Sequence, residues 1–250
     1  MLQEESFNAG LKRRARELIR AAMPTAAIVS AVWFGVSVLL AILSQEVSGV
    51  NDFYDALLKE IQQVSSRGMD AAMSLDPMAI FSEHVKPSGS LLSFVLNVFQ
   101  FVVGAGFTWY CLALARGEKP EWKSLFDGFG QFFKLIWLEI LIGVFVSLWT
   151  ILFIIPGIIA AFRYSMAIYI MREHPEYSAL QCIRESKALM RGKKVDLFIL
   201  RLSFIFWGIL GSIIFMLLRV DVLALWLNIY VGVASANFYV AVAREGAAAA

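Results

Sequence analysis

The chain has 250 residues, of which 59% are hydrophobic and 17% are charged. Soluble domains are roughly 45–50% apolar and about 25% charged, so this composition excludes a disordered chain, a collagen-like chain and an ordinary soluble fold. The formal net charge of +2 is too small for an electrostatic nucleic-acid binder. Cys111 and Cys182 fit neither a disulfide framework nor a zinc or CxxC spacing. We therefore expect one membrane domain over residues 1–250, without a metal, cofactor or nucleic-acid partner.

Membrane-spanning helices are predicted from the intervals that lack charged residues, because an ionised side chain at the bilayer centre costs roughly 2.5–3.5 kcal/mol. A hydrocarbon core of about 30 Å takes about 20 helical residues. Together these rules place spans at residues 25–44, 91–115, 198–218 and 222–243. The first span has no small-residue cleavage site after Ser44, so we expect a membrane anchor and not a removed signal peptide.

Residues 135–171 form an apolar stretch of 37 residues, too long for one span because a straight helix of this length would measure about 55 Å. Proline removes a helical hydrogen-bond donor, and glycine accepts unusual backbone angles. Pro156 and Gly157 therefore predict a hinge, with an outbound span before it and a shorter return span after it. The expected fold is an all-α bundle of six transmembrane helices.

The charges of the connecting segments predict the orientation. Residues 1–24 carry five basic and three acidic side chains, residues 116–134 carry four and three, and residues 172–196 carry six and four. Residues 45–89 carry three basic and seven acidic side chains. With six spans the basic segments all lie in the cytoplasm, as the positive-inside rule requires, whereas five spans would place residues 172–196 outside. We expect a bacterial inner-membrane protein with both termini in the cytoplasm and an extracytoplasmic loop at residues 45–89.

Amphipathic helices are predicted outside the bilayer. Residues 52–64 place Phe53, Leu57, Ile61 and Val64 on one helical stripe, and a second short helical piece is expected at residues 69–73. This loop is interpreted as a solvated connector, with a gate or ligand lid as the alternative. Residues 8–20 form a similar helix on the cytoplasmic side.

Residues 172–196 predict an interfacial helix, because Ser178 and Gln181 form a capping box and Gly192 ends the pattern. Its apolar residues Leu180, Ile183 and Met190 are expected to point one way. The basic cluster, which we expect to contact anionic lipid headgroups, is Arg184, Lys187, Arg191, Lys193 and Lys194. The alternative is that these charges only set the topology.

Two charged residues, Glu139 and Arg163, lie in the apolar stretches, and an intramembrane charge is a functional candidate by default. Folding about Pro156 and Gly157 places Glu139 beside Arg172 or His174 and away from Arg163. The alternative for both charges is that each reaches its nearer interface.

Four polar residues are expected to face the bundle interior, either as structural hydrogen-bonding groups or as a transport path: Asn97, Gln100, Asn228 and Asn237. Small residues four apart mark faces for close helix packing or for a homo-oligomer: Ala27, Ala31 and Gly35; Gly208 and Ser212; Gly232 and Ala236.

Catalytic patterns are missing from the sequence. The two histidines, His84 and His174, are predicted on opposite sides of the membrane, and no GxSxG, HExxH, Walker or GxGxxG pattern occurs. We therefore expect a protein that is not an enzyme.

Several motifs together resemble a bacterial family of polytopic membrane proteins catalogued as domain of unknown function number 975. They are residues 11–18, 115–120, 125–129, 148–149, 154–159, 164–166, 185–187, 189–194, 202–204, 207 and 238–239. The chain departs from the family at Gln181-Cys182, where Glu-Ala is usual, and at residues 228–230, where Pro-Tyr is usual; the acidic loop resembles an insertion. The resemblance implies the polytopic topology but no activity.

The sequence thus favours an inner-membrane protein that acts through lipid or protein contacts in envelope maintenance. The alternative is a small transporter or exporter component with a polar path between its helices.

Overall fold

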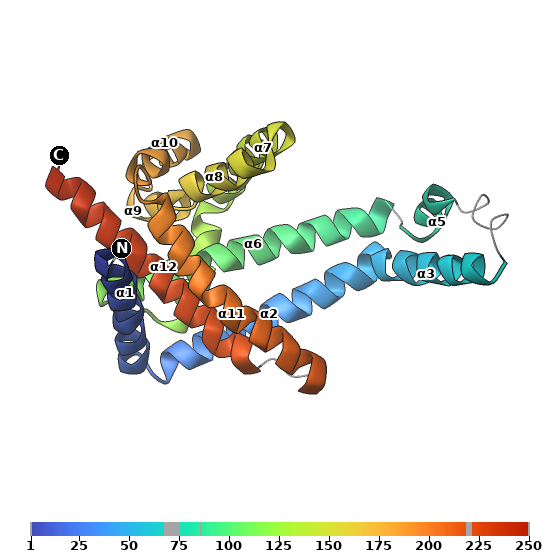
Figure 1. Cartoon of the computed structure of the whole chain (residues 1–250), viewed down its shortest axis with the longest axis horizontal. Coiled ribbons are helices and arrows are strands. Elements are labelled where there is room, and N and C mark those ends of the chain that lie inside the picture. The colour runs from blue at the N-terminus through green and yellow to red at the C-terminus, as the bar shows by residue number, and fades with distance from the viewer. Residues whose placement is uncertain (1, 68–75, 86, 219–221, 250) are drawn as a thin grey trace. The chain divides into compact units, whose positions relative to one another are not determined.

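The computed structural model describes residues 2–67, 76–85, 87–218 and 222–249. The predicted all-α fold is confirmed, because these residues form helices and no strand (Figure 1). The second short piece expected at residues 69–73 lies outside the described residues. The chain divides into two compact units, Gly35–Phe101 and a larger unit of Met1–Phe34 with Val102–Ala250. The expected single domain over residues 1–250 stays a prediction.

Six helices among the described residues are long and apolar enough to cross a membrane, which marks a multi-pass membrane protein. This is the number predicted from four charge-free intervals and one hairpin. The six helices are Thr25–Ser48, Pro87–Arg116, Trp122–Leu152, Ile154–Glu173, Lys194–Ile213 and Leu223–Ala248. Many of their apolar side chains are exposed, including Phe133, Ile151 and Phe206. Exposed apolar surface of this kind suits a hydrocarbon solvent better than water.

The smaller unit contains the larger part of α2 (Thr25–Ser48), α3 (Val50–Arg67), α5 (Pro77–His84) and the first part of α6 (Pro87–Arg116). Helix α3 confirms the helix expected over residues 52–64. Its Phe53 packs edge-on against Phe81 of α5, with ring centroids 5.5 Å apart. Asp76 caps α5 by accepting hydrogen bonds from the backbone N–H groups of Met78 and Ala79.

The larger unit begins with α1 (Leu2–Ala21), which confirms the helix expected over residues 8–20. Its Leu11, Ala15 and Ile19 are buried, with one turn of helix between successive side chains. They pack α1 against α12 (Val222–Ala249), which lies beside α11 (Lys194–Leu218). The structure thus uses the apolar stripe of α1 as a contact with protein.

Close packing in the larger unit depends on small residues. The end of α6 lies against the 3-10 helix η1 (Trp122–Gln131), where a Cβ at Gly106 would lie 1.9 Å from the carbonyl oxygen of Leu125. On α12, Gly232 faces Cys111 and Phe107 of α6, and Ala236 is fully buried. The Gly232 and Ala236 face is therefore occupied within the chain. An oligomer contact through the other two small-residue faces stays a prediction.

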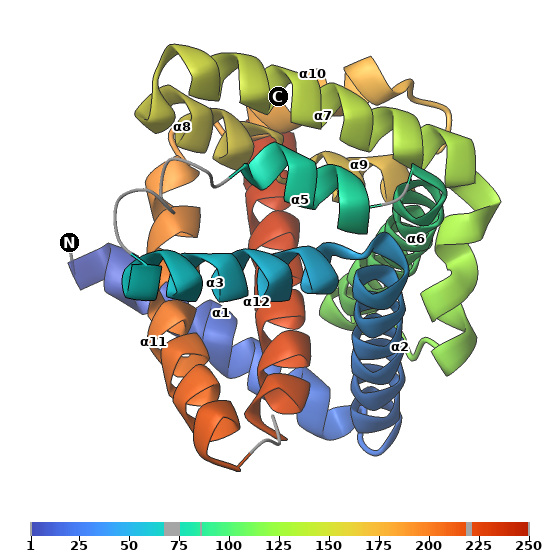
Figure 2. The same cartoon turned by 90° about the vertical axis from the view of Figure 1, so that its right-hand side faces the viewer.

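The predicted hairpin is confirmed, but its turn lies three residues before the expected hinge. Helix α7 (Phe132–Leu152) ends at Phe153, whose backbone is extended, and α8 (Ile154–Tyr164) returns beside α7 (Figure 2). Pro156 lies in the first turn of α8, where a helical N–H has no acceptor, so proline starts the return helix and does not break it. Gly157 lets α8 approach Thr150, because a Cβ there would lie 2.1 Å from the hydroxyl oxygen.

After α8 the chain forms a short turn at Ser165 and Met166, then α9 (Ala167–Glu173) and α10 (Ala179–Leu189). The capping box predicted for α10 is present: the Gln181 backbone N–H donates to the Ser178 hydroxyl at 3.3 Å, and the Ser178 backbone N–H donates to the side-chain Oε1 of Gln181 at 2.7 Å. Ser186 of α10 is fully buried and bridges two backbone groups at the α8–α9 turn. Helix α10 is therefore anchored to this turn.

Candidate functional site

The predicted basic cluster lies along α10 and the turn after it. Arg184, Lys187 and Arg191 are exposed and spaced for one helical face. Lys193 instead forms an ion pair with Glu245 at 2.7 Å, and hydrogen bonding to Glu245 raises the pKa of Lys193. Lys194 is half-buried as the first residue of α11. The structure thus leaves three of the five predicted residues exposed, and we call Arg184, Lys187 and Arg191 the basic face.

The apolar side of α10 contacts protein, although Leu180, Ile183 and Met190 were predicted to point one way on an interfacial helix. Ile183 and Met190 are buried, together with Cys182, while Leu180 is 49% exposed. Burial raises the pKa of the Cys182 thiol, which therefore stays protonated at neutral pH. Helix α10 packs on α7, α8 and α9. Its orientation is fixed by protein contacts, so its basic face is held outward.

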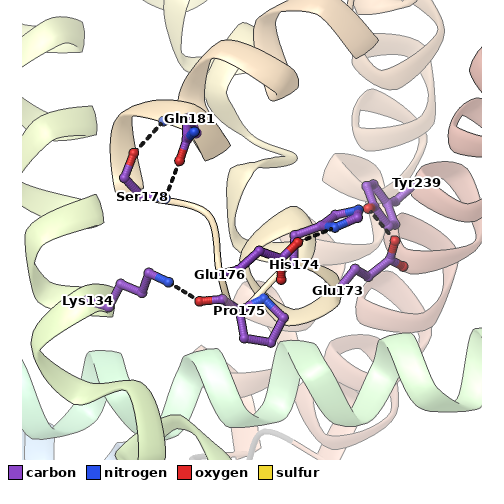
Figure 3. A network of polar contacts seen from close by, with 8 residues as sticks. All are labelled: Lys134, Glu173, His174, Pro175, Glu176, Ser178, Gln181 and Tyr239. Atoms are coloured by element: carbon purple, nitrogen blue, oxygen red, sulfur yellow. Dashed lines mark hydrogen bonds and ion pairs between the residues drawn. The ribbon is translucent and has the colours of Figure 1, made fainter.

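A polar network surrounds Glu173, the last residue of α9 (Figure 3). One carboxylate oxygen accepts a hydrogen bond from the Tyr239 hydroxyl of α12 at 2.8 Å. The other forms an ion pair with Arg116, the last residue of α6. Tyr169 stacks on Tyr239, with ring centroids 5.0 Å apart. Glu173 thus joins α6, α9 and α12.

Arg172 makes the next link, and it corrects the predicted partner of Glu139. Its guanidinium lies 2.7 Å from the Asp127 carboxylate of η1 and 5.0 Å from the ring centroid of Trp109. His174 faces Glu176 instead, at 3.0 Å. Glu139 is exposed and forms no ion pair with any residue that the structure describes. Glu139 was assigned the wrong partner because the chain turns at Phe153 and not at Pro156 and Gly157. The earlier turn places residues several positions earlier in the return segment opposite each residue of α7.

The loop from His174 to Ser178 borders this network (Figure 3). His174 stacks on Tyr177 with ring centroids 4.5 Å apart, and Lys134 of α7 donates to the Pro175 carbonyl. Hydrogen bonds from its own backbone N–H and from His174 lower the pKa of Glu176. These contacts hold the loop against α7.

A pocket of about 530 Å³ opens beside the network, within the range of roughly 300–1,000 Å³ typical of small-molecule sites. Its polar lining is Glu173, His174, Tyr177, Glu185 and Tyr239. Carboxylates beside aromatic rings are suited to bind a cation. Of these residues, Glu185 and Tyr239 belong to the motifs of the family resemblance and His174 was considered as a metal ligand, but none was predicted to form a pocket. The sequence did contain one signal for the network around Glu173. Arg116 and Glu173 have opposite charges, and each borders a span at the membrane face predicted to be cytoplasmic.

The four polar residues predicted to face the bundle interior are divided between the two units. Asn97 donates to the Ser44 hydroxyl at 2.9 Å and to the Ser93 carbonyl at 2.8 Å, which joins α2 to α6 within the smaller unit. Gln100 is half-buried in the same unit. In the larger unit, Asn237 is buried and donates to the Leu11 carbonyl of α1 at 3.4 Å, and Asn228 is half-buried. Both bonded asparagines therefore join helices.

Arg163 forms no ion pair with any residue in the part of the chain that the structure describes. Its side chain is half-buried, and its backbone carbonyl accepts a hydrogen bond from Ser186 at 2.8 Å. Within the described residues, no three His, Cys, Asp or Glu side chains are grouped to hold a metal ion.

Comparison with known proteins bears on nearly two fifths of the chain, the part in which the basic face and Glu173 lie. Residues 151–245 match the family model DUF975. The family is described as a protein of unknown function, and the predicted resemblance is confirmed over these residues. The DUF975 segment runs from the end of α7 through α12 and contains the hairpin return, Glu173 and all of α10. Neither the curated proteins nor the solved structures yielded a match.

Proposed function

We propose that the chain is a bacterial inner-membrane protein that is not an enzyme and acts in envelope maintenance by contacting anionic lipid through its basic face. Both termini and the basic face lie in the cytoplasm in this proposal, because the positively charged segments then all lie inside.

The observation that carries the proposal is the arrangement of α10. Its buried side is held by Ile183 and Met190, while Arg184, Lys187 and Arg191 stay exposed. A basic residue near an anionic leaflet contributes about 1 kcal/mol, so three contribute about 3 kcal/mol, or a factor of more than about 100 in binding. Since protein contacts already orient α10, little ordering entropy opposes this contact.

The alternative function, a small transporter or exporter component, is favoured by the pocket of about 530 Å³ beside Glu173. A substrate path would need this pocket to continue between the spans. Asn97 and Asn237, the polar groups predicted for such a path, instead make interhelical hydrogen bonds in separate units.

The test compares lipids of different charge. The triple variant Arg184→Gln, Lys187→Gln and Arg191→Gln is placed in nanodiscs of phosphatidylglycerol and of phosphatidylcholine. We expect the melting temperature to fall in phosphatidylglycerol and to change little in phosphatidylcholine, because bound lipid stabilises the folded state by mass action. The matched control exchanges Arg and Lys at the same three positions and keeps the charge. Equal loss of stability in both lipids would leave the basic face without a lipid role.

A further inference from the structure

A second pocket, of about 270 Å³, lies between α1, α11 and α12 and shares no residue with the basic face or the Glu173 network. Its lining residues are Lys12, Arg16, Ser203, Phe204, Trp207, Leu223, Trp226, Leu227 and Tyr230. The volume lies just below the usual range for small-molecule sites, so it suits part of a ligand better than a whole one.

One side of the pocket is cationic. Lys12 and Arg16 are four residues apart on α1 and therefore stand one helical turn apart. The apolar stripe of the same helix, Leu11, Ala15 and Ile19, is turned toward α12. The Lys12 ammonium lies 5.2 Å from the ring centroid of Phe204. Burial and the neighbouring Arg16 lower the pKa of Lys12. No described carboxylate forms an ion pair with either side chain, so an anionic ligand would relieve the repulsion between two like charges.

The other side of the pocket is apolar and aromatic. Tyr230 packs edge-on against Phe204, with ring centroids 5.2 Å apart, and lies 6.4 Å from Trp226. Trp207 and Trp226 remain 48% and 39% exposed, respectively. Both belong to helices that are apolar enough to span a membrane. Hydrocarbon chains of the bilayer can therefore reach this side, whereas a small hydrophilic anion would leave it uncovered.

We propose that this pocket binds one anionic phospholipid, with the phosphate at Lys12 and Arg16 and the beginning of an acyl chain against Trp207 and Trp226. The rest of the lipid extends into the bilayer. This inference rests on the membrane location in the proposed function but not on the basic face. It does not rest on the predicted cytoplasmic position of residues 8–20 either, because Leu223 and Trp226 lie in the first turns of α12, at the end that six spans place outside. The basic face would attract anionic lipid only by its charge, whereas this pocket would bind one lipid molecule at a defined, saturable site.

The experiment uses the full chain in detergent and phosphatidylglycerol that carries bromine on an acyl chain, because bromine quenches tryptophan fluorescence on contact. We expect a saturable component of quenching, in addition to the quenching of other exposed tryptophans such as Trp137 and Trp149, and only this component should be lost in the double variant Trp207→Phe and Trp226→Phe. Lys12→Gln and Arg16→Gln should each weaken binding about fivefold, the effect of one charge near an anionic headgroup. Arg13→Gln is the matched control and should bind as the unchanged chain does, because Arg13 is on the same helix, outside the pocket and 77% exposed.

Three further measurements separate the alternatives. Brominated phosphatidylcholine should quench at least tenfold more weakly, and inorganic phosphate should not displace the bound lipid. Lys12→Arg and Arg16→Lys should keep the affinity, which separates loss of charge from loss of folding. The triple variant of the basic face should also keep it, so failure of the proposed function would leave this result unchanged. Equal binding of both lipids, displacement by phosphate, or unchanged affinity in the Gln variants would overturn the inference.

Discussion

Ser186 should be among the most sensitive small residues of the larger unit. Its side chain is fully buried. The hydroxyl donates to the Arg163 carbonyl at 2.8 Å and accepts from the Met166 backbone N–H at 3.2 Å. These groups flank the turn between α8 and α9, where the regular helical hydrogen bonds are interrupted. The variant Ser186→Ala would leave both groups without this partner.

The expected cost follows from burial. An unsatisfied buried backbone group costs about 1–3 kcal/mol. The Met166 site is fully buried and the Arg163 carbonyl is partly buried, so we expect Ser186→Ala to lower the free energy of unfolding by about 2–4 kcal/mol. The assay is unfolding by sodium dodecyl sulfate in mixed micelles, followed by far-ultraviolet circular dichroism.

The matched control is Ser165→Ala, whose hydroxyl donates to the Phe162 carbonyl within the same turn of chain and is only partly buried. This variant should lower the free energy of unfolding by less than about 1 kcal/mol, because water or lipid headgroups can replace the hydrogen bond. If Ser186→Ala cost no more than Ser165→Ala, the claim that α10 is anchored through Ser186 would be refuted.

Two further predictions concern topology and pairing. In a chain whose Cys111 and Cys182 are replaced by serine, a cysteine at Phe153 should be labelled by a membrane-impermeant maleimide from outside the cell, and one at Gly192 should not; outside labelling at Gly192 would contradict six spans. In a double-mutant cycle, Arg172→Gln and Asp127→Asn should couple by about 0.5–1 kcal/mol, because the two side chains form a partly exposed ion pair. The effects of Arg172→Gln and Glu139→Gln on the free energy of unfolding should be additive within error. Coupling between them would indicate that the hairpin turns at Pro156 and Gly157.

Local sequence patterns were enough for several elements, each for an identifiable reason. Charge-free intervals located the spans because hydrocarbon excludes ionised side chains whatever the neighbouring helices are. The capping box at Ser178 and Gln181 was predictable because its hydrogen bonds join residues three apart. The hairpin was predictable from length. Its turn was misplaced because Pro156 is equally compatible with breaking a helix and with starting one, and only the packing of Gly157 on Thr150 decides between them.

The candidate sites depended on contacts that the sequence does not encode locally. Arg116, Glu173 and Tyr239 are far apart along the chain, and their network exists because α6, α9 and α12 end or cross at one place. The apolar stripe of α10 was visible in the sequence, but its contact with protein in place of lipid was not. A stripe shows that a helix buries one side, and it carries no information about what covers that side.

The sequence by itself determined that this chain is helical and membrane-spanning, which stretches of it form the spans, and which segments carry the positive charge. Those properties depend on each residue's own transfer free energy, which acts before any helix meets another. Only the tertiary structure decided that Lys193 pairs with Glu245 while Arg184 stays exposed, and that Lys12 and Arg16 of α1 lie beside Trp207 and Trp226. Within a bilayer, lipid is as apolar as a neighbouring helix, so hydrophobicity alone does not choose between helix packings; close fit and individual polar contacts do.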